Sequence, residues 1–263
     1  MEGDPVGREA EAGEPEAEAG ARALRRAVAV VWLLTAVLVL HPTYRMVGAD
    51  YLSRLGLSEV WMFLACAFEL ALGVRVWRGP SNAAVSLVQV SMIAAFTLIL
   101  AFLEPLLLAS PFGVLTKNLP IVAAIGVAYL LEREGWSPRA TWWLRLGMAI
   151  IWFSEGLLPK IFFQQEVELA IVAELGFIPF DPARFLLLLG AAQALSGALA
   201  LLMPMGPWLR ALLLLQALSL VALPLLVGAV SPELFVHPFG PLTKTIPIVV
   251  GTALLARRCS TSR

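Results

Sequence analysis

The chain is poor in charge, cysteine and histidine, and each shortage excludes a class of protein. Charged residues are 14% of the chain, against roughly 25% in ordinary soluble domains, so a soluble protein is excluded. The formal net charge is zero, which leaves no basic field for nucleic acid. Two cysteines, Cys66 and Cys259, lie far apart and form no CxxC motif, so a disulfide or thiol relay has no support.

Catalytic motifs are also missing. The chain contains no GxGxxG before a strand, no Walker loop, no HExxH and no GxSxG. His41 and His237 are the only histidines, and both precede a proline in expected loops, so we predict no haem and no metal site. We therefore assign no catalytic residue and expect no resident cofactor that the residues themselves reveal.

Long apolar runs are what the chain has in abundance. It is 59% hydrophobic, and runs of about 17 to 25 apolar residues are long enough to cross a bilayer. Their length and their leucine and alanine content predict helices and not the alternating strands of a barrel. We predict an all-α membrane protein with eight transmembrane helices, near residues 24–41, 58–77, 82–108, 115–131, 142–162, 183–203, 208–230 and 241–257.

The sequence is repeated. Ser110–Val122 reads SPFGVLTKNLPIV, and His237–Val249 reads HPFGPLTKTIPIV. Trp32 and Trp152 also correspond, so the repeat extends over each half of the chain. We predict two tandem, same-orientation four-helix bundles, over residues 24–135 and 142–258.

The two ends differ from the rest. Residues 1–23 are rich in acids, alanine and glycine and hold no aromatic residue, so we predict a disordered acidic tail, not a secretory signal. Residues 259–263 form a short C-terminal tail. Arginines such as Arg26, Arg78 and Arg139 outnumber the basic residues of the opposite loops, which predicts that both termini are cytoplasmic.

Polar residues inside the apolar runs are the candidates for function, because an ionisable group at mid-bilayer costs about 2.5 to 3.5 kcal/mol. We expect Glu155 to pair with Lys244 or Lys160 in a polar pocket that suits the head group of a quinone or lipid. An alternative is that these groups neutralise each other and only lock the helices. The candidate ligand-binding residues are Glu69, Lys117, Glu155, Lys160, Gln193, Thr243 and Lys244.

The two repeated lysines admit two interpretations. Lys117 and Lys244 each stand where an outer loop enters a helix, after a glycine turn. A positive group at a helix N-terminus suits an anionic or carbonyl ligand. Alternatively, the lysines extend to the membrane surface and mark its boundary.

These motifs resemble the DoxX-like membrane proteins. Their four-helix unit carries W-x-x-x-G-L-x-P-K in the first helix and P-F-G-P-L-x-K-N before the last. The first pattern is matched by Trp152, Gly156, Leu157, Pro159 and Lys160, and the second by Pro238, Phe239, Gly240, Pro241, Leu242 and Lys244. In the first half, Ala36, Val39 and Leu40 replace the expected Gly, Pro and Lys, so the second half is the better candidate for a site.

The resemblance implies a function as well as a fold. Some relatives are subunits of thiosulfate:quinone oxidoreductase, which implies a bacterial inner-membrane accessory or anchor subunit for quinone-linked redox metabolism, without catalysis of its own. Its partners would be the lipid bilayer and a quinone or redox enzyme. Two alternatives stay open: a small-molecule or ion transporter whose halves rock against each other, and a subunit that reduces quinone with electrons from a partner.

Overall fold

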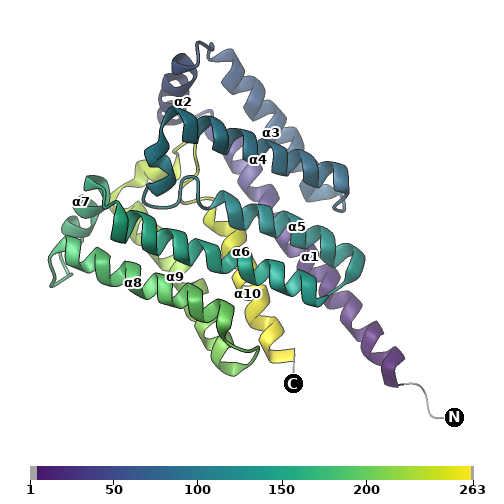
Figure 1. Cartoon of the computed structure of the whole chain (residues 1–263). Helices are drawn as coiled ribbons and strands as arrows, with labels where there is room; N and C mark the ends of the chain where they lie inside the picture. Colours follow the sequence, from purple (N-terminus) through teal and green to yellow (C-terminus); the bar gives the residue numbers. More distant parts are fainter. Residues whose placement is uncertain (1–4, 262–263) are drawn as a thin grey trace.

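The computed structural model describes residues 5–261, and this part of the chain consists of helices and loops (Figure 1). In chain order the elements are α1 (Pro5–Leu38), α2 (Pro42–Arg54), α3 (Val60–Arg78), α4 (Ala83–Leu103), η1 (Pro105–Ala109), α5 (Asn118–Glu134), α6 (Pro138–Leu157), η2 (Leu158–Phe162), α7 (Glu166–Glu174), α8 (Pro182–Leu202), α9 (Pro207–Val230), η3 (Pro232–Phe235) and α10 (Thr245–Thr261). The predicted all-α class is confirmed.

Local sequence signals fix where several helices begin. Asn82, Ser137 and Asp181 each accept a hydrogen bond from a backbone N–H in the first turn of α4, α6 and α8. Proline occupies the first turn of α2, α6, α8 and α9, where its missing N–H has no helical partner to lose. These caps place the helix starts at the predicted breaks between apolar runs.

Four helices form the centre of the molecule. The helices α1, α5, α6 and α10 pack on one another, while α3, α4, α8 and α9 lie outside them (Figure 1). Equivalent pairs recur in the two halves: α1 packs on α3 as α6 packs on α8, and α4 on α5 as α9 on α10. The central helices of one half pack on those of the other, so two separate four-helix bundles are not confirmed.

Membrane spans are confirmed in part. By length and composition, α3, α4, α8 and α9 qualify as spans, and two bent pairs raise the total to six. The bends measure 89° between α1 and α2 and 94° between the α6–η2 segment and α7. The remaining expected spans fall on α5 and α10, which have 17 residues each and lie in the centre. A helix of this length measures about 25 Å, short of the roughly 30 Å hydrocarbon core.

The acidic segment at the N-terminus differs from its prediction. Within the expected disordered tail, residues 5–23 are helical and continue directly into the apolar part of α1, while residues 1–4 lie outside the described part. Ala17 and Ala21 are buried, and Gly20 lies close to Trp136 in the loop that follows α5. Composition alone missed this, because alanine and glutamate have high helix propensity and the segment packs on its neighbour.

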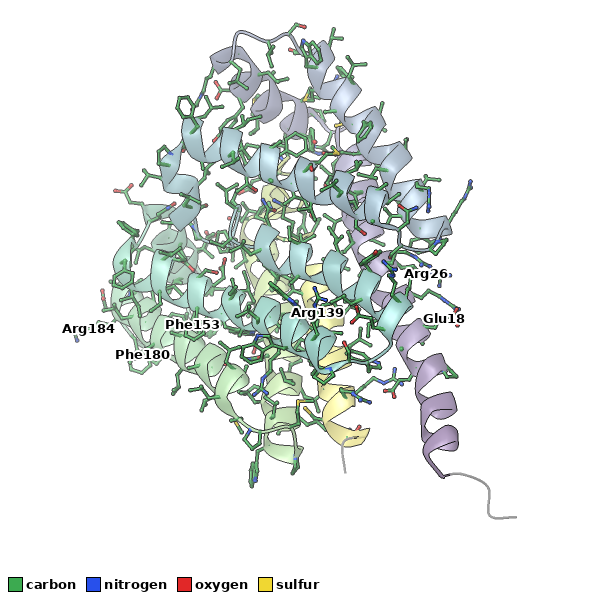
Figure 2. All side chains as sticks on the ribbon, turned by 45° about the vertical axis from the view of Figure 1, so that its right-hand side comes forward. Glu18, Arg26, Arg139, Phe153, Phe180 and Arg184 are labelled. Atoms are coloured by element: carbon green, nitrogen blue, oxygen red, sulfur yellow. The ribbon has the colours of Figure 1, made fainter. Side chains whose placement is uncertain are left out.

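The positions of charged side chains agree with the predicted grouping of loops. Figure 2 shows Glu18 and Arg26 beside α1 on the right of the view, Arg139 near its centre, and Arg184 at the left edge. The labelled apolar side chains Phe153 and Phe180 lie on the left of the view, on the side of Arg184. The loop after α3, the end of α5 and α1 lie together, because Glu132 accepts a hydrogen bond from Ser81 N at 2.6 Å and pairs with Arg25.

Helices α6 and α8 approach closely because both have glycine at the contact. A Cβ on Gly156 would lie 2.5 Å from the Gly190 carbonyl oxygen and 2.8 Å from the Ala194 nitrogen. Both neighbours are backbone atoms, so neither can move aside without shifting a helix. This contact fixes the distance between α6, which carries Glu155, and α8, which carries Gln193.

We predict that Gly156→Ala lowers the thermal midpoint of the protein in detergent micelles, because overpacking of this kind costs about 1–3 kcal/mol. Gly126→Ala in α5 is the matched control, since a Cβ there meets nothing within 4 Å. The control should leave the midpoint unchanged or raise it, because alanine favours helix. Equal midpoints for the two variants would contradict the close contact.

Candidate functional site

The two repeated segments form tight loops that enter the central helices α5 and α10. Gly113 has a φ of 67° and Gly240 a φ of 57°, which is the left-handed region that favours glycine. A Cβ on Gly113 would lie 2.2 Å from Glu155 Oε1, so this glycine also admits the Glu155 carboxylate to the loop. We call residues 110–117 and 237–244 the first and second repeat loops.

The lysine of each repeat loop binds the backbone of the other repeat loop. Lys117 Nζ donates to the Pro241 carbonyl at 2.6 Å, and Lys244 Nζ donates to the Val114 carbonyl at 2.9 Å. Val114 and Pro241 occupy the same position in the repeat. Each lysine therefore leaves its own half and binds the backbone of the other. Neither lysine extends toward a membrane surface, because both end on carbonyl groups inside the protein.

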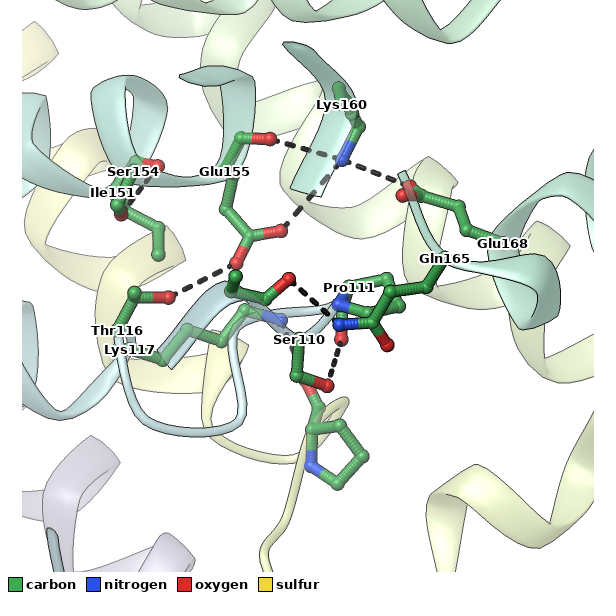
Figure 3. Close-up of polar contacts among 12 residues, drawn as sticks. Ser110, Pro111, Thr116, Lys117, Ile151, Ser154, Glu155, Lys160, Gln165 and Glu168 are labelled. Atoms are coloured by element: carbon green, nitrogen blue, oxygen red, sulfur yellow. Dashed lines mark hydrogen bonds and ion pairs between the residues drawn. The ribbon is translucent and has the colours of Figure 1, made fainter. Parts of the chain in front are cut away.

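In the second half, three charged side chains form an ion cluster (Figure 3), comprising Lys160, Glu168 and Glu155. Lys160 Nζ lies 3.0 Å from Glu168 Oε1 and 4.0 Å from Glu155 Oε2, and it donates to the Glu155 carbonyl at 3.2 Å. The side chains of Lys160 and Glu168 are almost fully buried. Thr116 donates to Glu155 Oε1 at 3.3 Å, which ties the first repeat loop to this cluster.

A break in α6 makes the ion cluster possible. After Leu157 the helix widens into the single π turn η2, where Phe163 N bonds to the Leu158 carbonyl at 2.8 Å, and α7 then turns away. This turn brings Glu168 back toward Lys160. Gln165 Nε2 also donates to the Ala109 carbonyl at 3.1 Å, so the segment after the break is anchored to the first half.

The first half contains a cavity of about 350 Å³, which is the size of a small-molecule site. We call it the first-half cavity. It is lined by α1, α2, α3, α4 and the start of α5, and closed by Pro238, Phe239 and Lys244 from the second repeat loop. Most of the lining is apolar, with the polar groups gathered near α2, α3 and the loop. The cavity is thus completed by residues from both halves.

One acid in this cavity has no partner. Glu69 is 5% exposed, lines the cavity, and its Oε2 atom makes no hydrogen bond. Lys244 also lines the cavity, close enough for its charge to act on the Glu69 carboxylate. Beside them, Tyr44 Oη and Cys66 Sγ lie 3.5 Å apart. The polar wall therefore offers an unpaired acceptor and a cationic donor to whatever occupies the cavity.

Matched positions of the two halves have different partners. In the first half, Trp32 Nε1 donates to Gln89 Oε1 at 3.1 Å at the wall of the cavity. In the second half, Trp152 Nε1 is unpaired, and Gln216 instead donates to Ser196 Oγ at 2.7 Å. Gln193, the counterpart of Glu69, is buried against Gly156 with its Oε1 atom unpaired.

Aromatic and charged groups gather at the α2 end of the first-half cavity. Tyr51 donates to Glu104 Oε2 at 2.6 Å and contacts the Phe239 ring edge-on at a centroid distance of 4.8 Å. Arg54 lies 3.6 Å from Glu104 and also covers the Tyr51 ring. In the adjacent loop, burial lowers the pKa of His237, and the charge of Lys244 adds to this effect.

The predicted site residues separate into two places. Glu69 and Lys244 meet at the first-half cavity, whereas Lys117, Glu155 and Lys160 gather at the ion cluster. The expected Glu155–Lys160 pair is present at long distance, but Lys244 does not pair with Glu155, because its Nζ atom binds the Val114 carbonyl. The remaining candidates join neither group: Thr243 makes a local turn contact with Gly240, and Gln193 packs against α6.

Two residues of these sites, Glu168 and Tyr44, were not predicted from the sequence. Glu168 was overlooked because it follows a helix break and its counterpart in the repeat is Gly48, so only the break at Pro159 signals it. Tyr44 was overlooked because it lies in the short helix α2, and the sequence prediction treated this segment as a loop between two spans. Among residues 5–261, no group of three or more His, Cys, Asp or Glu is placed to hold a metal ion.

Comparison with known proteins identifies the family. The sequence model of the DoxX-like family matches residues 29–126 and again residues 149–253. This chain belongs to the DoxX-like family. The two matches cover both halves in the same order, as a tandem duplication requires. No curated protein and no solved structure matches the chain.

We predict that Lys117→Met and Lys244→Met each lower the thermal midpoint, because each leaves a buried carbonyl without its donor, at about 1–3 kcal/mol. Arg45→Met is the control, since Arg45 is an exposed basic residue of α2. Thermal unfolding in detergent measures all three. If the lysine variants behave like Arg45→Met, the lysines act only at the membrane boundary.

Glu168→Ala should destabilise the protein by about 3–5 kcal/mol, because it leaves Lys160 buried beside a distant Glu155. Glu166→Ala tests the same change on the exposed side of α7. The difference in unfolding midpoint between the two variants reports the buried pair. A small effect of Glu168→Ala would show that the ion cluster does not hold α7 in place.

Proposed function

We propose that this chain is an accessory or anchor subunit for quinone-linked redox metabolism in the bacterial inner membrane, and that it holds a quinone or quinol in the first-half cavity without catalysis of its own. The observation that carries the proposal is Glu69, a buried acid without a hydrogen-bond partner in a largely apolar cavity. A buried polar group without a partner is costly, and a bound molecule would satisfy it.

The residues of the cavity fit the chemistry of such a molecule. A quinone ring is apolar and carries carbonyl oxygens that accept hydrogen bonds, and Lys244 can donate to one of them. A quinol carries hydroxyl groups, and the Glu69 carboxylate can accept from one of them. The apolar lining from α1, α3 and α4 suits the ring and the start of an isoprenoid tail. When bound, the quinone would supply the redox chemistry, and the protein would supply orientation.

The proposed location follows from the family and the distribution of charge. The apolar helices indicate a multi-pass membrane protein. The start of α1 and the end of α10 lie toward the same end of the molecule (Figure 1), which supports both termini on one side. The excess of arginine in the loops of this end favours the cytoplasmic side.

Transport is less well supported by the geometry. A transporter built from two parallel repeats needs halves that move against each other around a central site. Here the central helices α1, α5, α6 and α10 pack across the two halves, and the repeat loops are joined by both lysines. The cavity also lies mainly among first-half helices, with only Pro238, Phe239 and Lys244 from the second half, and its lining includes no residue of the ion cluster. Binding is therefore the activity that we favour.

The proposal is tested by purifying the protein from membranes and measuring bound quinone by mass spectrometry. We expect quinone to co-purify, and Glu69→Gln to reduce its amount by about tenfold, the effect of losing about 1.4 kcal/mol of binding. Glu155→Gln is the matched control, because it alters an acid outside the cavity. Absence of quinone, or equal loss in the two variants, would disprove the proposal.

A further inference from the structure

The first-half cavity exists because its outer helices do not close on each other. In the second half, α8 packs on α9, and α9 packs along α10. In the first half, α3 packs on α1 and α2, α4 packs on α5 and η1, and α3 and α4 have no extensive contact. Figure 1 shows α3 and α4 diverging from the loop that joins them. At the loop that joins α3 and α4, Glu132 Oε2 accepts a hydrogen bond from Ser81 N at 2.6 Å. The distance between α3 and α4 therefore increases away from this loop.

The gap between α3 and α4 reaches the surface of the molecule. Trp61 of α3 and Phe96 and Ile99 of α4 line the cavity, yet these side chains are 56%, 36% and 41% exposed. A residue that both lines a cavity and is exposed marks its opening. The helices that carry these residues qualify as membrane spans, so this opening faces lipid and not water. Its rim is apolar, as a contact with acyl chains requires.

The α2 end of the cavity differs from this gap in chemistry: Leu55 and Leu57 line the cavity there and are each 40% exposed, but charged and aromatic groups stand beside them. At this end, Tyr51, Glu104 and Arg54 are joined by a hydrogen bond, an ion pair and a ring contact, and Phe239 packs against Tyr51. These contacts connect α2, the end of α4 and the second repeat loop. A molecule arriving at this end would pass charged and hydrogen-bonded groups, whereas one arriving between α3 and α4 would meet apolar side chains.

We propose that the gap between α3 and α4 is a lateral portal through which a lipid-dissolved amphiphile reaches Glu69 from the bilayer. The inference rests on the proposed function in one respect, that the cavity holds a ligand, but it concerns the route and not the ligand. It adds a specificity: molecules that partition into the membrane reach the site, and charged water-soluble molecules do not. The second half has no such opening, because α8 and α9 pack together.

The test uses a native reporter in the cavity and needs no quinone. Cys66 is a free, buried thiol that lines the first-half cavity. The other cysteine, Cys259, is removed as Cys259→Ser. The protein is placed in lipid nanodiscs and treated either with N-(1-pyrenyl)maleimide, which dissolves in the bilayer, or with the charged reagent MTSET, which stays in water. Intact-mass spectrometry follows the modification of Cys66 with time.

Variants of α4 change the width of the portal. Phe96→Ala removes a rim side chain and should speed pyrenylmaleimide labelling, whereas Ile99→Trp adds bulk at the rim and should slow it. A change of about tenfold is expected for each, equivalent to about 1.4 kcal/mol in the barrier. The matched controls lie on the same helix away from the cavity: Phe102→Ala and Leu98→Trp, at residues 85% and 70% exposed, should leave the rate unchanged.

The outcomes separate the route from the ligand. Labelling by the bilayer reagent that responds to both rim variants in opposite directions, and no labelling by MTSET, supports the portal. Faster labelling by MTSET, rates that ignore the rim variants, or a Cys66 that neither reagent reaches would overturn it. Protection of Cys66 by added decylubiquinone, lost in Glu69→Gln, is read separately. If decylubiquinone does not protect Cys66, the proposed function is contradicted, but the portal is still supported by the effects of the rim variants.

Discussion

Polar groups inside an apolar molecule must find partners within the protein, and in the two repeat loops each lysine finds its partner in the other loop. Lys117 and Lys244 each bind a backbone carbonyl of the opposite loop, at matched positions. In lipid, such donors have no water to turn to, so the arrangement fixes where α5 and α10 begin. The positions of the cavity and of the ion cluster both follow, because each contains one of these lysines or lies beside it.

From one duplicated sequence, the two halves have become chemically different. In the second half, Lys160 forms ion pairs with Glu155 and with Glu168, the acid that the chain supplies after the π turn. In the first half, the acid Glu69 faces a cavity instead of a partner side chain. Glu168 Oε2 also lacks a hydrogen bond, but the charge of Glu168 is paired with Lys160 at 3.0 Å, and a paired carboxylate has less need of a ligand than one that faces a cavity. We therefore place the proposed binding site in the first half, although its first motif departs further from the family pattern.

Much of the architecture could be predicted from sequence, and much of the site could not. Run length and composition identify the helices, and the repeated SPFGVLTKNLPIV segment identifies the duplication, because both signals are local. Sequence also selected Glu69, Glu155, Lys117, Lys160 and Lys244 by the cost of charge in an apolar run. It could not assign partners. The crossing of lysines between halves, the return of Glu168 after a helix break, and the separation of α3 from α4 all depend on tertiary packing.

The exchange of lysines has a consequence for the origin of the chain. Contacts that are the same in both directions are those of a symmetric homodimer, in which each subunit gives what it receives. A protein with one such unit would meet the same need by self-association, and fusion of two gene copies would then preserve the interface within a single polypeptide. Once fused, the copies no longer have to remain identical, and one can specialise while its twin acts as scaffold.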